Sequence, residues 1–392
     1  VVTSVVLPES VVKIGGASFC DCKNLSSVTL PQGIVEIGGS AFAECPKLTV
    51  IDIPDGLQKA AWLAEETVQL RCSFGSSAAF ALSKGGNSFC AGDFQMRYLF
   101  DDEGNRNGLR LNKYLGTDAE VTVPEEVTET GSAFSGCATV TKITLPAGLT
   151  NLKNSAFSDC TALREIVIPE SVTSIGESAF DGYASLMEIR LPAGITEIPT
   201  ALFSGCKALS AASIPEGVVS IGSGAFRNCA SLTELALPQG LKKIGSNAFI
   251  GCKSLTYIEI PDGVETVEYF IAESTIQLRC AIGSSAAVAV SRSNDGFYSD
   301  DLYLRYTFDG DGVQNGLTLM KYVGASSEVI VPDGVTELQY STFSECRQLL
   351  TRVVLPNGLL SIPESLLNNC TNLKEVVIPE SVTTIENHAF FG

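Results

Sequence analysis

The stretch Leu145-Pro146-Ala147-Gly148-Leu149, continued by Ala156-Phe157-Ser158-Asp159-Cys160, decides the fold, because the chain repeats it throughout its length. Its general form is I-x-I-P-x-G-V-x-x-I-G-x-x-A-F-x-x-C-x-x-L, and consecutive copies of its proline within a run lie 22 to 24 residues apart. These prolines are Pro8, Pro31, Pro54, Pro124, Pro146, Pro169, Pro192, Pro215, Pro238, Pro261, Pro332, Pro356 and Pro379. A fixed period of this length predicts a solenoid, in which each repeat packs only against its neighbours.

Each repeat contains the pattern of two short strands and a turn. In Ser27-Val28-Thr29-Leu30, polar and apolar residues alternate, which is typical of a half-buried strand. Pro31 ends this strand, because proline cannot donate a hydrogen bond to the sheet. Ile34 and Ile37 are expected to point inward from a second short strand, and Phe42 is expected to fill the core from a compact turn. We therefore predict a curved, right-handed superhelix of mainly β repeats about 23 residues long.

Two insertions interrupt the period and resemble each other. Gln277-Leu278-Arg279-Cys280 repeats Gln69-Leu70-Arg71-Cys72, so a longer period of about 208 residues is superimposed on the shorter one. The sequence therefore predicts five segments. They are a first block of repeats at 1–54, an insertion at 55–123, a second block at 124–261, a second copy of the insertion at 262–331 and a third block at 332–392.

The first insertion is expected to contain short helices and a β-hairpin. Residues 59–64 favour a short helix. Residues 75–85 favour a second helix, with serine at its start and glycine at its end. Residues 95–100 and 109–114 are expected to pair around a turn that ends in Asn107-Gly108. The second insertion matches these helix and hairpin sequences.

The repeat also carries a family resemblance. Ile168-Pro169-Glu170-Ser171-Val172-Thr173-Ser174-Ile175-Gly176, followed by Ala179-Phe180, resembles the BspA-like, or treponemal-type, leucine-rich repeat. The resemblance covers almost the whole chain. The departures from the family pattern are Tyr183 for cysteine, Ile198-Pro199 and Ile362-Pro363 for Ile-Gly, and Leu367 for phenylalanine.

This resemblance implies a leucine-rich repeat solenoid from a bacterial, less often protist, cell-surface or secreted protein. Members of the family are associated with adhesion to host proteins or to other cells. The family has no shared set of catalytic residues to carry over. The resemblance therefore implies an extracellular location, and a host or cell-surface protein or glycan as the partner.

The thirteen cysteines are spaced like packing residues rather than like a disulfide framework. Nine of them follow the repeat phenylalanine position by three residues: Cys22, Cys45, Cys137, Cys160, Cys206, Cys229, Cys252, Cys346 and Cys370. One thiol per turn predicts a ladder of small buried side chains, with partial disulfides as the alternative. Cys20, Cys72, Cys90 and Cys280 lie outside this ladder, and a Cys72–Cys90 bridge would have no copy, because Tyr298 replaces Cys90 in the second insertion.

The composition disfavours several classes of partner. The formal net charge of −18 disfavours nucleic acid and anionic lipid, because both are bound by basic surfaces. The 45% hydrophobic content is enough for a large core. Neither a signal peptide nor a transmembrane run is visible, so we expect no direct membrane insertion of this segment. Both ends fall inside repeats, and we therefore expect a fragment of a longer protein, with targeting and anchoring segments outside it.

Residues for chemistry are scarce. The single histidine, His388, fills a variable position two residues before Phe390 and is expected at the surface. Neither a phosphate-binding loop nor a dinucleotide fingerprint is present. Residues 101–105 and 309–312 superficially resemble calcium loops, but the ligand order of an EF-hand is not met, and a hairpin turn explains them equally well. We therefore expect no enzyme activity, no cofactor and no metal site, with calcium binding as the alternative for these two loops.

The outward positions of the first strand form the informative surface. Residues four and two positions before each proline are expected to face the concave side of the solenoid. From these positions we select a candidate ligand-facing strip: Glu165, Glu188, Arg190, Glu234, Tyr257, Glu259, Arg352, Val354 and Val377. The plain interpretation is a solubilising face, and the sharper one is a binding surface, because solenoids bind partners on extended concave surfaces.

Taken together, these patterns predict a non-enzymatic binding module at the cell surface or outside the cell. Adhesion would occur through protein–protein or protein–glycan contacts on the face of the solenoid. The alternative is a passive stalk that presents another domain of a longer protein.

Overall fold

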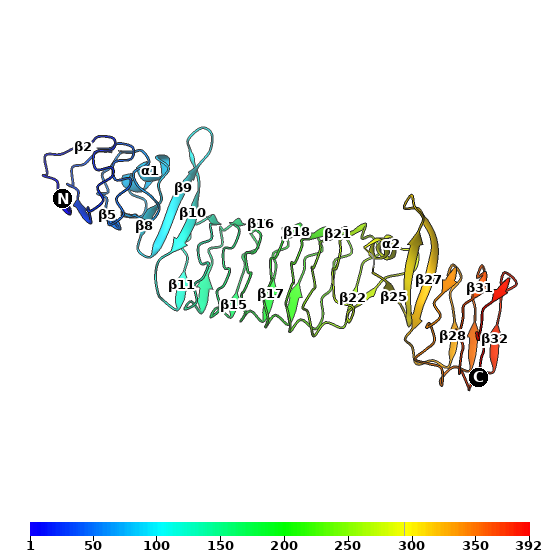
Figure 1. Ribbon diagram of the computed structural model, residues 1–392. Helices are drawn as coiled ribbons and strands as arrows, with labels where there is room; N and C mark the ends of the chain where they lie inside the picture. Colours follow the sequence, from blue (N-terminus) through cyan, green and yellow to red (C-terminus); the bar gives the residue numbers. More distant parts are fainter. Residues whose placement is uncertain (294) are drawn as a thin grey trace. The chain divides into compact units, whose positions relative to one another are not determined.

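The computed structural model describes residues 1–293 and 295–392 as a β-solenoid with short parallel strands in successive turns (Figure 1). The chain forms two compact units. The first comprises Val1–Ile195 and Leu202–Lys207, and the second comprises Thr196–Ala201 and Ala208–Gly392. The division lies within the predicted block at 124–261, and each unit is described by itself below.

The first row of strands, called the main strands, carries the outward face. In the first unit the main strands are β1 (Ser4–Val6), β3 (Ser27–Thr29), β5 (Val50–Asp52), β7 (Gln69–Arg71), β11 (Glu120–Thr122), β13 (Lys142–Thr144), β15 (Glu165–Ile166) and β17 (Glu188–Arg190). In the second unit they are β19 (Ala211–Ser213), β22 (Tyr257–Glu259), β24 (Gln277–Arg279), β28 (Glu328–Ile330), β30 (Arg352–Val354) and β32 (Glu375–Val377). In β11, Val121 is buried between exposed Glu120 and Thr122, so the predicted alternation is confirmed.

A second row of two-residue strands follows the repeat prolines, as predicted from the inward-pointing isoleucines. In the first unit these are β2 (Lys13–Ile14), β4 (Glu36–Ile37), β6 (Lys59–Ala60), β12 (Glu129–Thr130), β14 (Asn151–Leu152) and β16 (Ser174–Ile175). In the second unit they are β18 (Glu197–Ile198), β20 (Ser220–Ile221), β21 (Lys243–Ile244), β23 (Thr266–Val267), β29 (Glu337–Leu338), β31 (Ser361–Ile362) and β33 (Thr384–Ile385).

The prediction of a helix over residues 59–64 is wrong. Residues Lys59 and Ala60 form β6, which pairs in parallel with β4 and places Ala60 beside Ile37. The amide of Ala61 then donates to the carbonyl oxygen of Ile37 across 3.3 Å. Hydrogen bonds from the preceding turn therefore override the helix propensity of the two alanines, which is only a weak preference.

Phenylalanine side chains fill the core, as predicted for Phe42, which is fully buried. In the first unit the rings of Phe134, Phe157 and Phe180 stack on successive turns, with centroids 5.6 and 5.5 Å apart. Each of these rings has 0% exposure. The stacked rings connect neighbouring turns along the core, so loss of one ring affects the turn on each side of it.

The two insertions share one design. In the first, α1 (Ser77–Lys84) is capped by the Ser76 hydroxyl, and is followed by β8 (Phe89–Ala91), β9 (Phe94–Phe100) and β10 (Arg106–Tyr114). In the second, α2 (Ser285–Arg292) is capped by the Ser284 hydroxyl, and is followed by β25 (Phe297–Ser299), β26 (Leu302–Phe308) and β27 (Gln314–Tyr322). The predicted second helix and the hairpin are confirmed. Each hairpin joins a main-strand sheet to the second row, in the orders β5-β7-β8-β9-β10-β12 and β22-β24-β25-β26-β27-β29 (Figure 1).

The position of the hairpin turn differs from the prediction. Asn107 and Gly108 already belong to β10, where Gly108 pairs with Leu99. The turn lies over residues 101–105, because the Asp101 carboxylate accepts hydrogen bonds from the amides of Glu103 and Asn105 across 3.0 and 2.8 Å. Aspartate commonly organises a turn in this way, and this local bonding outweighs the Asn-Gly signal.

None of the thirteen cysteines forms a disulfide. Seven of the nine ladder cysteines are buried, and Cys22 and Cys137 are half-buried, so the predicted thiol ladder is confirmed. Outside the ladder, the pairing of Arg71 with Cys90 in parallel strands directs the Cys72 and Cys90 side chains to opposite faces. The Cys72–Cys90 alternative is therefore incompatible with this register.

Candidate functional site

The predicted strip lies on the outward face of the main strands. The exposed members are Glu165, Glu188, Arg190, Glu234, Tyr257, Glu259 and Val377, and the half-buried members are Arg352 and Val354. Glu234 lies in a turn of the solenoid whose residues 232–238 form no regular strand. The positions are thus those that the alternation predicts, and a ligand-binding role for them stays a prediction.

Several strip residues already have partners within the chain. Arg190 forms an ion pair with Glu170 at 3.3 Å, and Arg352 pairs with Glu375 at 2.9 Å. These pairs are exposed or half-exposed and therefore contribute little to stability. They fix the direction of the two arginines and lower the number of donors that a ligand would meet there.

An apolar row extends from the end of the second insertion into the third block, within the second unit. Val354 pairs in register with Ile330 on one side and with Val377 on the other. Ile330 is 67% exposed and Val377 is 37% exposed. The predicted exposure of Val354 and Val377 as neighbours is therefore correct in position, although Val354 is only partly open to solvent.

A hollow of about 830 Å³ opens on the same face in the second unit. We call it the small-residue trough, because Ala211, Ser213 and Ala236 occupy outward positions that carry long side chains on other turns. Glu234 and Tyr257 of the predicted strip line this trough. The guanidinium of Arg279 covers one face of the Tyr257 ring from β24, at 4.1 Å from the centroid. The opposite face of the ring is therefore directed toward the trough.

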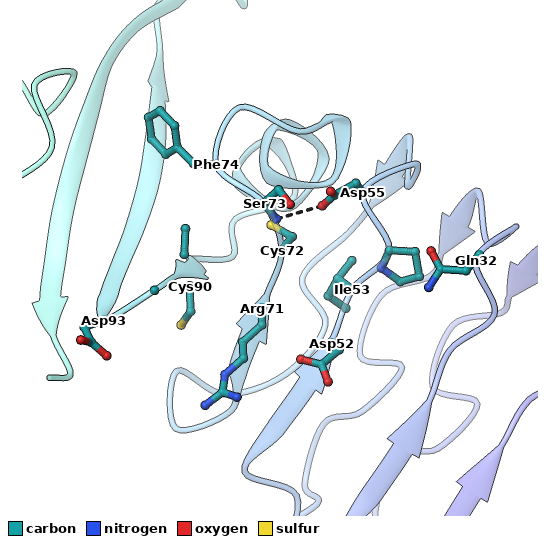
Figure 2. A pocket seen from close by; sticks show the side chains of 13 residues that line it. Gln32, Asp52, Ile53, Asp55, Arg71, Cys72, Ser73, Phe74, Cys90 and Asp93 are labelled. Atoms are coloured by element: carbon teal, nitrogen blue, oxygen red, sulfur yellow. Dashed lines mark hydrogen bonds between the residues drawn. The ribbon is translucent and has the colours of Figure 1, made fainter.

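Each insertion forms a further hollow beside its arginine. The Arg71 hollow has a volume of about 870 Å³ and is lined by Asp52, Arg71 and Asp93 among others. Figure 2 shows the Arg71 side chain extending between Asp52 and Asp93. The Arg279 hollow, of about 540 Å³, is lined by Glu259, Arg279 and Asp301 at the equivalent positions.

The same neighbour positions both arginines. A side-chain nitrogen of Arg71 donates to Gln69 Oε1 across 3.1 Å, and Arg279 Nη2 donates to Gln277 Oε1 across 3.2 Å. These pairs lie two residues apart on one strand, so their side chains share one face. Arg279 also contacts Glu259 at 3.3 Å, whereas Arg71 makes no ion pair among the residues that the structure describes.

The thiols of the Arg71 hollow are not suited to nucleophilic chemistry. Burial raises the pKa of Cys72 to about 12 and that of Cys90 to about 11, so both thiols stay protonated near neutral pH. Hydrogen bonds from Ser73 lower the pKa of Asp55, which keeps that carboxylate charged and occupied. Within residues 1–293 and 295–392, His, Cys, Asp and Glu side chains do not gather into a metal-binding group of three. The charged side chains of Asp52, Arg71 and Asp93 also line this hollow and can form hydrogen bonds.

Sequence reasoning missed both arginine hollows. The signal is present as the repeated Gln-Leu-Arg-Cys of residues 69–72 and 277–280, which by itself indicates only a duplication. In addition, no helix among the described residues is long and apolar enough to span a bilayer. His388 is exposed, as predicted, and its ring contacts Phe391 edge-on at 5.5 Å.

Stacked turns with short parallel main strands and a buried phenylalanine ladder define a leucine-rich repeat solenoid. The family model described as "BspA type Leucine rich repeat region" matches six copies over residues 1–62, 118–210, 196–285 and 322–392, which is most of the chain. The chain belongs to this family. A comparison with proteins of curated function gave no match.

Several solved leucine-rich repeat structures are similar to this chain. A leucine-rich repeat protein of T. pallidum is 29% identical, with 43% of this chain and 91% of that chain covered and a TM-score of 0.38. One from Bacteroides ovatus is 22% identical, with 97% and 82% covered and a TM-score of 0.40. A leucine-rich cell surface protein of Faecalibacterium prausnitzii is 22% identical, with 78% and 86% covered and a TM-score of 0.39.

Proposed function

We propose that this chain is a non-enzymatic adhesion module of a bacterial cell surface, which binds a protein or glycan on its main-strand face. Membership of the BspA-type family supports the surface location. The repeat pattern supports the choice of face, because its fixed apolar positions point inward and its variable positions point outward. Partner recognition must therefore depend on the outward residues.

The observation that carries this proposal is the small-residue trough. A solubilising face needs only charged residues, whereas the trough combines a floor of small side chains with an open aromatic face and a carboxylate at Glu234. Binding sites are typically concave and mostly apolar, with a few polar groups that orient the ligand. The trough meets this description on the strip selected from the sequence.

Retention of the chain by epithelial cells and by bacterial cells of other species tests the proposal. The unaltered, fluorescently labelled chain is expected to be retained, and Ala236→Arg, which fills the trough, is expected to lose retention by at least about tenfold. Thr266→Arg is the matched control, because Thr266 is exposed on the second row of strands, away from the trough. A passive stalk would not be retained specifically by any of the cells. If Ala236→Arg and Thr266→Arg lower retention equally, the choice of the main-strand face is overturned.

A second experiment addresses the rest of the strip. Glu165→Gln, Glu188→Gln and Glu234→Gln are combined in one variant, which removes three negative charges and keeps the side-chain shapes. If every interaction of the unaltered chain persists in this variant, the acidic residues of the strip have no role in binding. Loss of the interaction, with an unchanged melting temperature, supports their role.

A further inference from the structure

The two insertions repeat one set of polar groups while the residues around it differ. Each hollow is lined by a carboxylate two residues before the repeat proline, an arginine and a second aspartate, and the arginine donates to a glutamine two residues before it. Between the copies, Cys90 is replaced by Tyr298, and Gly92 is replaced by Asp300. The arginine and these two carboxylates are therefore present in both hollows, although other lining residues differ.

The scaffold fixes these polar groups in place. Asp52 pairs in register with Arg71 on β5 and β7, and Glu259 pairs in register with Arg279 on β22 and β24. The second aspartate is held through its backbone, because the carbonyl oxygen of Asp93 accepts from the amide of Leu115 across 2.8 Å. In the second copy, the carbonyl oxygen of Asp301 accepts from the amide of Val323 across 2.9 Å. In each hollow, the backbone that carries the two carboxylates beside the guanidinium is therefore fixed by hydrogen bonds.

The donors and acceptors point to the chemistry of the ligand. A guanidinium only donates hydrogen bonds, and a carboxylate only accepts them. A hydroxyl does both, so two adjacent hydroxyls satisfy an arginine and a carboxylate that lie side by side. Arg71 has five N–H groups and uses one in its bond to Gln69, which leaves donors for such a ligand.

The charged groups of each hollow disfavour strongly charged ligands. Each hollow combines one arginine with three carboxylates, in a chain of net charge −18, so an anion is repelled by the surroundings. A cationic side chain would meet the guanidinium that lines the hollow beside the carboxylates. An uncharged ligand rich in hydroxyls avoids both penalties.

We propose that the Arg71 hollow and the Arg279 hollow are two related binding sites for neutral glycans, one in each insertion. The inference rests on the proposed function, since both arginines lie on main strands, and it names the ligand class. Two sites in one chain raise the avidity for a surface that displays many copies of a glycan. The Arg71 site is the stronger one, because Arg279 already contacts Glu259 and covers the Tyr257 ring.

Titration calorimetry with the full chain tests this inference, using neutral oligosaccharides of hexose and N-acetylhexosamine that are first ranked on a glycan array. The unaltered chain is expected to bind two molecules, and Arg71→Gln or Arg279→Gln is expected to bind one. The double variant is expected to lose at least about tenfold in affinity, as is the double Arg→Lys variant, because lysine lacks the planar fork of donors. Arg227→Gln is the control, since Arg227 is exposed in the turn after Phe226 and lies outside both hollows.

Three outcomes overturn the inference. In the first, the chain binds none of the neutral oligosaccharides. In the second, it binds only sialylated or sulfated glycans or a lysine-rich peptide. In the third, the double variant binds neutral oligosaccharides as well as the unaltered chain does. Cell retention that depends on Ala236 but not on the two arginines would leave the adhesion proposal intact and remove the glycan sites. If the cells retain none of the chain but calorimetry shows two bound saccharides, the adhesion proposal is overturned and the glycan sites remain.

Discussion

The thiol of Cys160 donates a hydrogen bond to the carbonyl oxygen of Phe134, one turn earlier in the solenoid, with 3.1 Å between sulfur and oxygen. The same bond, at the same length, joins Cys206 to Phe180 in the first unit and Cys252 to Phe226 in the second. The carbonyl of Phe134 also accepts from the amide of Cys137. The cysteine of the repeat therefore connects consecutive turns, which spacing alone could not show.

Replacing Cys160 should reveal the strength of this connection. Cys160→Ala removes the hydrogen bond and leaves a small cavity, so the free energy of unfolding is expected to fall by about 2 kcal/mol. Cys160→Ser keeps a donor and should recover part of this loss. Cys20→Ala is the control, because Cys20 is half-exposed and lies outside the ladder. The free energies come from urea denaturation followed by circular dichroism, and equal values for Cys160→Ala and Cys20→Ala would refute a stabilising thiol bond.

The buried thiols also predict a loss of stability at alkaline pH. Burial raises the pKa of Cys160, Cys206 and Cys252 to about 12 each, from an ordinary value of 9.0. Below about pH 9 the thiols are protonated in both the folded and the unfolded state. Between about pH 9 and 12 only the unfolded state loses these protons, so folding becomes less favourable by about 1.4 kcal/mol per thiol and pH unit.

Melting temperatures measured from neutral pH up to about pH 11 test this dependence. The unaltered chain should show a falling melting temperature as the pH rises above about 9. A variant with serine at Cys160, Cys206 and Cys252 should show a shallower fall, because a serine hydroxyl does not titrate in this range. Equal slopes for the two proteins would mean that other groups cause the alkaline instability.

Tyr183 occupies the cysteine position of its turn and should be a site of easy stabilisation. Its side chain is fully buried, and its hydroxyl has no hydrogen-bond partner among the residues that the structure describes. Burial raises the pKa of this hydroxyl, which therefore stays neutral. Tyr183→Phe removes the unpaired group with little change in shape, and the free energy of unfolding is expected to rise by about 1–3 kcal/mol.

Tyr114→Phe is the matched control for this substitution. The Tyr114 hydroxyl accepts a hydrogen bond from the amide of Asp118 across 3.1 Å, so its loss should lower the free energy of unfolding by about 1 kcal/mol. Urea denaturation of the two variants gives both values. A decrease for Tyr183→Phe would show that the hydroxyl has a partner, such as a bound water.

The sequence correctly predicted whether a side chain is buried or exposed where this depends on the position of the residue within the repeat. The burial of Val121 between Glu120 and Thr122 follows from period-two alternation, and the burial of Phe42 follows from its place in the turn. The floor of the trough could also have been read from the small residues at Ala211 and Ala236. The exposure of the candidate strip belongs to the same class of prediction.

Local sequence patterns did not predict the structure where contacts with distant segments determine it. Lys59 and Ala60 form a strand because β4 offers them hydrogen-bond partners, which local propensity does not contain. Asp93 reaches the Arg71 hollow only after β8 has paired with β7 and β9 has turned back along it. Such a meeting depends on the topology of the insertion, so the carboxylates around Arg71 could not be assigned from spacing alone.

The two hairpin tips provide a test that separates a turn from a calcium loop. The Asp101 carboxylate accepts from the amides of Glu103 and Asn105, and the equivalent Asp309 carboxylate accepts from those of Asp311 and Val313, at 2.8 to 3.0 Å. Because these oxygens are already bonded within the turn, a chelator and millimolar calcium should both leave the melting temperature unchanged.

Substitution of the first tip completes this test. Asp101→Ala should lower the free energy of unfolding by about 1 kcal/mol with or without calcium, because it removes the bonds that close the turn. Asp102→Ala is the control, since Asp102 is exposed on the same tip and accepts none of these bonds. A melting temperature that rises with calcium in the unaltered chain, and not in Asp101→Ala, would instead identify the tip as an ion site.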